Sequence, residues 1–194
     1  MTRPLVLIPD LSLPGPELQA ASLDGELVPL GEGYLPVDAP LTPLTRAESL
    51  APLLVEPRIL LSDRTAAWVW GWLPAMPTLT TSVPIGSRIS SARRRRLGTR
   101  EVVIAEHEVH RWGAVGVTTR VRTLVDLARH DESPDLHTVL LAALRQQPEV
   151  YEPVEAYLNR PGRLSHVRRA RDRIARALDD SRADDGGDYP LLTR

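Results

Sequence analysis

The chain has 194 residues, a formal net charge of −1 and a hydrophobic fraction of 42%, which suits one domain or one domain with a small appendage. It contains no cysteine, so disulfide bridges and thiolate metal sites are excluded. No apolar run approaches the roughly 20 residues of a membrane helix, and residues 1–9 are too short an apolar segment for a signal peptide, so we expect a cytoplasmic protein without membrane contact.

The N-terminal segment predicts a small module. Residues 16–23 predict a short helix with proline in its first turn. Residues 26–30 and 34–37 flank Gly31-Glu32-Gly33, which is a hairpin signal. A short helix followed by a hairpin is typical of the end of a winged helix, so we interpret residues 1–42 as a truncated winged-helix-like module with its linker.

Residues 62–72 hold three of the four tryptophans. Ser62 is a good helix N-cap, and Gly71 fits the end of the helix. Nearly every residue between them is apolar, so the helix should be buried on most faces. We therefore expect Trp68 and Trp70 in the core, and the alternative is a stacking platform for bases or ligands.

The middle of the chain predicts a small sheet, which we expect to be antiparallel. Its strands are residues 58–61, 78–83 and 100–105, with a hairpin formed by residues 109–112 and 115–118. Between the second and third of these strands, residues 84–98 are polar and read as a connection that carries four consecutive arginines.

The last third predicts a helical bundle. Apolar residues recur at helical spacing in a helix that begins at Thr118 or Thr119, in one that follows Ser133, in residues 153–158 and in residues 165–178. The predicted fold is therefore α+β, with the module (1–42), a domain of sheet and bundle (43–178), and an acidic, aperiodic tail (179–194) that we expect to be disordered.

Motifs for catalysis are incomplete. His107-Glu108-Val109-His110 spaces its histidines three apart near a strand, whereas zinc proteases need four on a helix. Ile85-Gly86-Ser87-Arg88 lacks the second glycine of a nucleophile elbow, and no lysine exists to complete a phosphate-binding loop. We therefore expect no enzymatic activity, cofactor or metal, and a nuclease-related protein is the less favoured alternative.

Arginine accounts for every basic residue, and it is clustered. Up to Asp63 three arginines stand against nine acids, whereas residues 88–100 hold six arginines and no acid, and residues 160–182 hold eight arginines against three acids. Such clusters suit a polyanion, because phosphates relieve the repulsion between guanidinium groups and release counterions. A solvated surface is the alternative interpretation. The candidate nucleic-acid-binding residues are Arg93, Arg94, Arg95, Arg96, Arg168, Arg169, Arg171, Arg173 and Arg176.

Arg122 and Asp126 lie four residues apart on one predicted helix, so they can pair. We expect this pair to have a structural role.

Two segments resemble a known family. Leu61-Ser62-Asp63-Arg64-Thr65-Ala66-Ala67-Trp68-Val69-Trp70-Gly71 and Val115-Gly116-Val117-Thr118-Thr119-Arg120-Val121-Arg122-Thr123-Leu124-Val125-Asp126-Leu127-Ala128 are similar to segments of actinobacterial antitoxins of the abortive-infection AbiEi type. Arg120 stands where that family has proline. The resemblance covers residues 60–178.

The resemblance implies a non-enzymatic antitoxin or transcriptional regulator of a type IV toxin–antitoxin system. In that family an N-terminal winged helix binds promoter DNA, and the C-terminal domain counteracts a nucleotidyltransferase-like toxin. The alternative is a protein-interaction module that neutralises or scaffolds a partner protein without binding DNA.

Overall fold

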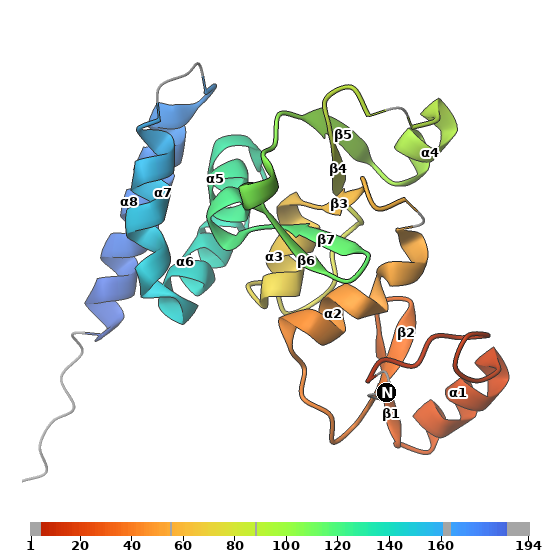
Figure 1. The fold of residues 1–194 in the computed structure, drawn as a ribbon. Coiled ribbons are helices and arrows are strands. Elements are labelled where there is room, and N and C mark those ends of the chain that lie inside the picture. Colours follow the sequence, from red (N-terminus) through yellow and green to blue (C-terminus); the bar gives the residue numbers. More distant parts are fainter. Residues whose placement is uncertain (1–4, 55, 88, 161–163, 186–194) are drawn as a thin grey trace, which may run out of the picture. The chain divides into compact units, whose positions relative to one another are not determined.

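A computed structural model describes residues 5–54, 56–87, 89–160 and 164–185. The chain divides into two compact units, residues 1–119 and residues 120–194, and each is described by itself (Figure 1). Unit 1 combines helices with two small sheets, and unit 2 is helical, so the predicted α+β class is confirmed. The boundary between the units falls inside the domain predicted for residues 43–178.

The N-terminal module of unit 1 has the predicted helix and hairpin. Helix α1 (Gly15–Leu23) precedes strands β1 (Leu27–Leu30) and β2 (Gly33–Pro36), which pair antiparallel. Leu7 and Tyr34 exchange backbone hydrogen bonds of 2.8 Å. A Cβ at Gly33 would lie 2.7 Å from the Leu7 oxygen, so only glycine permits this close approach.

The second sheet of unit 1 is mixed. It holds strands β3 (Leu60–Leu61), β4 (Thr81–Pro84), β5 (Thr99–Val102), β6 (Val109–Trp112) and β7 (Val115–Thr118), in the order β5-β4-β3-β7-β6. The pairs β3–β4 and β6–β7 are antiparallel, as predicted, but β3–β7 and β4–β5 are parallel. The prediction of an antiparallel sheet is therefore wrong.

The parallel pairs exist because the connections are long enough to cross over. Parallel neighbours need a crossover of about a dozen residues or more, usually with a helix. Residues 85–98 between β4 and β5 supply one, and they contain helix α4 (Ser91–Arg96). The polar connection that the sequence predicts there is thus the helical crossover of a β4–α4–β5 unit.

Helix α3 (Asp63–Trp70) forms the core of unit 1. Its six residues from Thr65 to Trp70 are all buried, and Gly71 ends it in the left-handed conformation with φ 88°. Trp68 and Trp70 are 3% and 5% exposed, so their predicted burial is confirmed. The Trp70 Nε1 donates to the Thr118 oxygen at the end of β7, at 2.9 Å.

The C-terminal end of α3 is held by helix α2 (Pro43–Ser49), which is followed by a 3₁₀ turn (Ala51–Leu53). The Arg46 Nη1 donates to the Trp68 oxygen at 2.7 Å and to the Leu73 oxygen at 3.2 Å. Its guanidinium lies over the Trp68 ring, 5.2 Å from the centroid. Burial lowers the pKa of Arg46, because desolvation disfavours the charged form.

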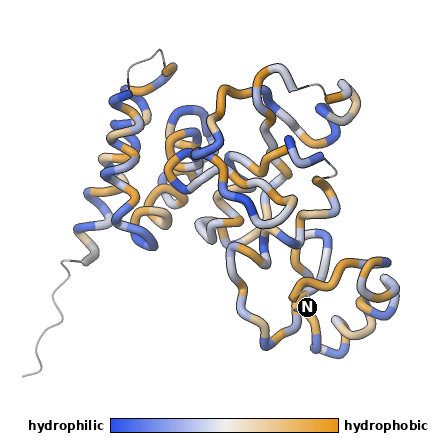
Figure 2. The backbone as a smooth tube through the Cα atoms, viewed as in Figure 1, coloured by the Kyte–Doolittle hydropathy of each residue, from blue (hydrophilic) through white to orange (hydrophobic). Residues whose placement is uncertain are grey.

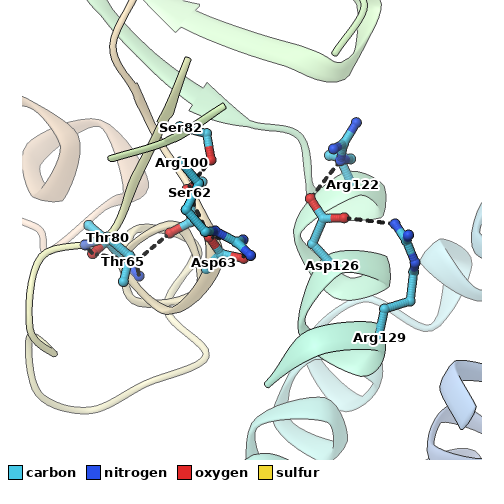
Figure 3. Close-up of polar contacts among 9 residues, drawn as sticks. All are labelled: Ser62, Asp63, Thr65, Thr80, Ser82, Arg100, Arg122, Asp126 and Arg129. Atoms are coloured by element: carbon cyan, nitrogen blue, oxygen red, sulfur yellow. Dashed lines mark hydrogen bonds and ion pairs between the residues drawn. The ribbon is translucent and has the colours of Figure 1, made fainter. Parts of the chain in front are cut away.

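The N-terminal end of α3 is capped by a residue from elsewhere in the chain (Figure 3). Ser62 occupies the cap position, but its hydroxyl donates to the Asp63 Oδ2 and accepts from the Ser82 hydroxyl, and it makes no cap bond. The Thr80 Oγ1 instead accepts the backbone N–H of Thr65 at 3.1 Å, and the Thr65 Oγ1 accepts the N–H of Thr80 at 2.8 Å. The predicted Ser62 cap bond is therefore wrong.

Unit 2 contains four α-helices within its described residues. They are α5 (Arg120–His130), α6 (Leu136–Gln146), α7 (Tyr151–Leu158) and α8 (Val167–Asp185). Short 3₁₀ turns occur at Pro148–Val150 here and at Glu106–Glu108 in unit 1. Most leucine, valine, isoleucine and alanine residues of the stripes predicted for this bundle are buried. Val121, Val167 and Leu178 are half-buried.

Helix α8 runs seven residues beyond Leu178, so the prediction of a disordered tail is wrong for residues 179–185. The buried face of α8 continues past Ile174 and Ala177 to Ser181. The rest of the predicted tail, residues 186–194, lies outside the described residues. Within the part of the chain that the structure describes, no helix is long and apolar enough to cross a membrane.

Thr80→Val should destabilise unit 1, because the Thr65 N–H loses its acceptor and the Ser62 carbonyl loses one of its two donors. Loss of a helix cap costs about 1–2 kcal/mol, so the melting temperature should fall by roughly 3–6 °C. Tryptophan fluorescence is a suitable probe, since all four tryptophans lie in unit 1. Thr78→Val, at an exposed position, is the matched control, and equal melting of the two variants would contradict the assigned cap.

Candidate nucleic-acid interface

Helix α4 carries the first arginine cluster. Leu97, which is buried directly after the helix, anchors it to the sheet, and the Leu97 oxygen accepts the Thr81 hydroxyl at 3.1 Å. An α-helix has 3.6 residues per turn, so four consecutive arginines point to different sides and cannot all contact one flat surface. Arg95 and Arg96 are exposed. The side chain of Arg93 lies outside the described part of the structure.

Two carboxylates pair with arginines, one within this cluster and one beyond its end. Arg94 of α4 pairs with Glu101 of β5. Arg100 lies four residues after Arg96. Its Nη2 is 2.6 Å from both carboxylate oxygens of Asp63, at the start of α3 (Figure 3). The arginines of this cluster therefore differ in how available they are to a ligand. Arg95 and Arg96 are exposed, whereas Arg94 is paired with a carboxylate that a phosphate would have to displace.

The arginines of α8 serve mainly to fasten that helix within unit 2. Arg169 and Arg173 both pair with Glu132. The Arg173 Nη1 also donates to the Ala128 and Asp131 oxygens at 3.0 and 2.9 Å, where it satisfies carbonyls at the C-terminal end of α5. Arg171 donates to the Asn159 side chain beyond α7.

The remaining two candidates of α8, Arg168 and Arg176, are exposed. The Arg176 Nε donates to the Asp172 oxygen of its own helix at 3.1 Å. Three of the five α8 candidates, Arg169, Arg171 and Arg173, therefore contact other segments of unit 2, and Arg168 and Arg176 are the better candidates for a ligand. Sequence reasoning could not separate the two groups, because the partners of Arg169, Arg171 and Arg173 lie at least a dozen residues away in the chain.

A buried ionic cluster organises α5 (Figure 3). The Arg122 Nε lies 2.6 Å from the Asp126 Oδ2, and the Arg129 Nη1 lies 3.4 Å from the Asp126 Oδ1. All three side chains are less than 10% exposed. Arg122 also donates to the Tyr157 hydroxyl of α7, and Arg129 to the Ser165 oxygen and hydroxyl.

This cluster contains the predicted Arg122–Asp126 pair and adds Arg129, which the sequence analysis missed. The i, i+3 spacing of Asp126 and Arg129 is a signal that could have identified it. Because Arg122 and Arg129 contact other parts of unit 2 and no member of the cluster is exposed, the cluster connects α5 to its neighbours and offers no surface to a ligand.

The histidine-containing segment before β7 has structural contacts. The Glu108 Oε2 accepts the Ala105 N–H at 2.9 Å, and the His110 ring lies 4.2 Å from the Trp112 ring, centroid to centroid. No group of three histidine or carboxylate side chains suited to a metal ion occurs among the described residues.

A cavity of about 210 Å³ lies between α6 and α8 in unit 2. Glu132, His137, Arg173 and Arg176 are among its lining residues. Glu132 is already paired with Arg173, and His137 contacts Asp180 at 2.8 Å. Opposite charges therefore balance around this cavity, and it is a weaker candidate for a polyanion than α4.

No family model and no curated protein matches the chain. A solved structure with a similar arrangement is that of the RV2827C protein from Mycobacterium tuberculosis, with a TM-score of 0.46 and 18% sequence identity. The match covers 86% of this chain and 64% of that one, so the chain spans less than two thirds of the length of that protein.

Asp126→Asn should destabilise unit 2, because two buried guanidinium groups would lose their shared counter-charge. Removing one member of a buried ion pair costs about 3 kcal/mol. Urea unfolding followed by far-UV circular dichroism should therefore show an earlier loss of helix. Glu132→Gln, a matched change in a 68% exposed carboxylate, should cost less than about 1 kcal/mol. Similar losses in both variants would show that burial does not set the strength of the Asp126 cluster.

Proposed function

We propose that this chain is a non-enzymatic, cytoplasmic regulator that contacts duplex DNA through arginines, with those of α4 as the principal contacts. The observation that supports this function best is the exposure of Arg95 and Arg96 on a crossover helix, in a segment of six arginines without an acid. Exposed arginines on a surface helix favour phosphate contacts, which position a protein on DNA.

The N-terminal module is the less favourable DNA-binding surface. Residues 1–42 hold one arginine and six acids, so the module would repel a phosphate backbone. DNA contact by this chain would therefore differ from that of a regulator that reads DNA with its winged helix. The proposed regulator keeps the AbiEi-like resemblance of residues 60–178 but places the contacts on α4, with Arg168 and Arg176 of α8 as further candidates.

Binding of a protein partner is the second candidate function, and the N-terminal module favours it. Of the nine exposed large hydrophobic residues in the described part of the chain, seven lie between Leu5 and Leu41, and Figure 2 shows the hydrophobic stretch that leads into α1. Exposed apolar residues on an acidic module suit a partner with a basic, apolar surface. A nucleotidyltransferase-like toxin is the partner that the family resemblance suggests.

Arg95→Gln/Arg96→Gln should weaken DNA binding and flatten its salt dependence. Each lost phosphate contact lowers the slope of log K against log salt by roughly 0.9, so the double variant should lose up to about 1.8. Gel shift or fluorescence anisotropy with the duplex upstream of the coding sequence, at several salt concentrations, measures both quantities. An unchanged slope would remove α4 from the interface.

Two further variants locate the contacts. Arg168→Gln/Arg176→Gln removes the same charge from exposed positions of α8. Weaker DNA binding by this variant would show that the second cluster also contacts DNA. Arg58→Gln, an exposed arginine outside both clusters, controls for net charge. Absence of binding by the unmodified chain at low salt would reject DNA contact and leave the protein-binding function.

Glu101→Gln should strengthen DNA binding, because the carboxylate that holds Arg94 would lose its charge. An exposed ion pair is worth less than about 1 kcal/mol, so the gain should be about two- to fivefold. Glu26→Gln removes an equal charge from an exposed position in the N-terminal module and controls for net charge. Equal gains in both variants would mean that Glu101 acts only through total charge.

A further inference from the structure

Two exposed apolar residues directly follow the neighbouring strands β4 and β5, at the same end of that parallel pair. Ile85 and Val103 are 63% and 77% exposed, and the other exposed large hydrophobic residues of the described chain all precede residue 42. Each directly follows a strand of the parallel β4–β5 pair. The Ile85 N–H donates to the Val102 oxygen at 3.0 Å, so the two side chains belong to adjacent backbone segments.

The backbone fixes Ile85 in this exposed position. The Ser87 N–H donates to the Pro84 oxygen at 3.0 Å, which closes a tight turn with Ile85 and Gly86 at its centre. Gly86 has φ 83°, a conformation that such a turn needs at its third residue and that glycine adopts without strain. Polar residues usually occupy turn tips, so an isoleucine held there beside an exposed valine is unusual and indicates a surface that becomes covered.

The charged residues near Ile85 and Val103 indicate what kind of partner could cover them. Ile85 begins the connection that continues into the arginines of α4. Val103 lies two residues after Glu101, which pairs with Arg94, so at most about 7 Å of chain separates the Cα atoms of Val103 and Glu101. Because Arg95 and Arg96 of α4 are exposed, a partner that covers this end of the β4–β5 pair and reaches α4 should combine negative charge with apolar faces. Duplex DNA does so, because its phosphates flank stacked base pairs.

We propose that Ile85 and Val103 form an apolar wedge that enters the minor groove and partly unstacks a base step, while the arginines of α4 contact the flanking phosphates. Aliphatic side chains used in this way kink the duplex toward the major groove, and arginine contacts hold the bent form. This inference rests on the proposed function, and it adds a shape-dependent mode of recognition that prefers easily kinked pyrimidine–purine steps.

The test measures bending separately from binding. A duplex of about 30 base pairs with a central TA step, labelled at both ends for energy transfer, reports its bend when the full chain binds. Ile85→Ser/Val103→Ser should abolish the bend and weaken binding about tenfold, because two aliphatic side chains lose their burial. The salt slope should stay unchanged, since the phosphate contacts remain.

A control replaces two apolar residues of the N-terminal module that are at least as exposed, Leu11→Ser/Leu23→Ser, and it should bend DNA like the unmodified chain. Ile85→Thr/Val103→Thr keeps the β-branched shape and should also lose the bend if the serine variant fails to fold. Binding and bending that persist in both wedge variants would overturn the wedge while the proposed function stands. Absence of DNA binding by the unmodified chain would overturn both.

Discussion

Helix α3 depends on hydrogen bonds that distant residues supply to its two ends. Thr80, from the segment before β4, accepts at the N-terminal end, and Arg46 of α2 donates at the C-terminal end. The helix is only eight residues long, and a helix of this length is marginal in water on its own. It exists because the sheet, α2 and the tryptophans form around it together, so the core of unit 1 is expected to fold as one cooperative body.

The sequence predicted best what is decided locally. The hairpins, the Gly71 helix end, the burial of Trp68 and Trp70 and the Arg122–Asp126 pair each follow from residues that are close in the chain. Three features could not be predicted in this way: the parallel β4–β5 pairing, the Thr80 cap and the contacts of Arg173. Each joins segments that are separated by at least a dozen residues. The end of α8 was missed because charged residues conceal its apolar stripe.

Arginine has three different roles in this protein, and the role of each arginine depends on whether a carboxylate or a carbonyl of the chain lies next to it. Arg122 and Arg129 share one buried carboxylate, Arg46 and Arg173 satisfy helix-end carbonyls, and Arg95 and Arg96 extend into solvent. The planar guanidinium, with five donors and a permanent charge, suits all three roles. A count of arginines therefore overstates a binding surface, because several of these arginines already bind carboxylates or carbonyls of the same chain.

Within its described residues, the α4 crossover joins the rest of unit 1 through Leu97, which is buried and accepts the Thr81 hydroxyl, and through the surface ion pair between Arg94 and Glu101. Its outward residues take no part in the core around α3. Mutations there can change charge and shape with little effect on stability, whereas mutations in α3 cannot. Homologous proteins could therefore diverge in what this helix recognises while they keep the same sheet, so ligand preference and fold are free to evolve at different rates.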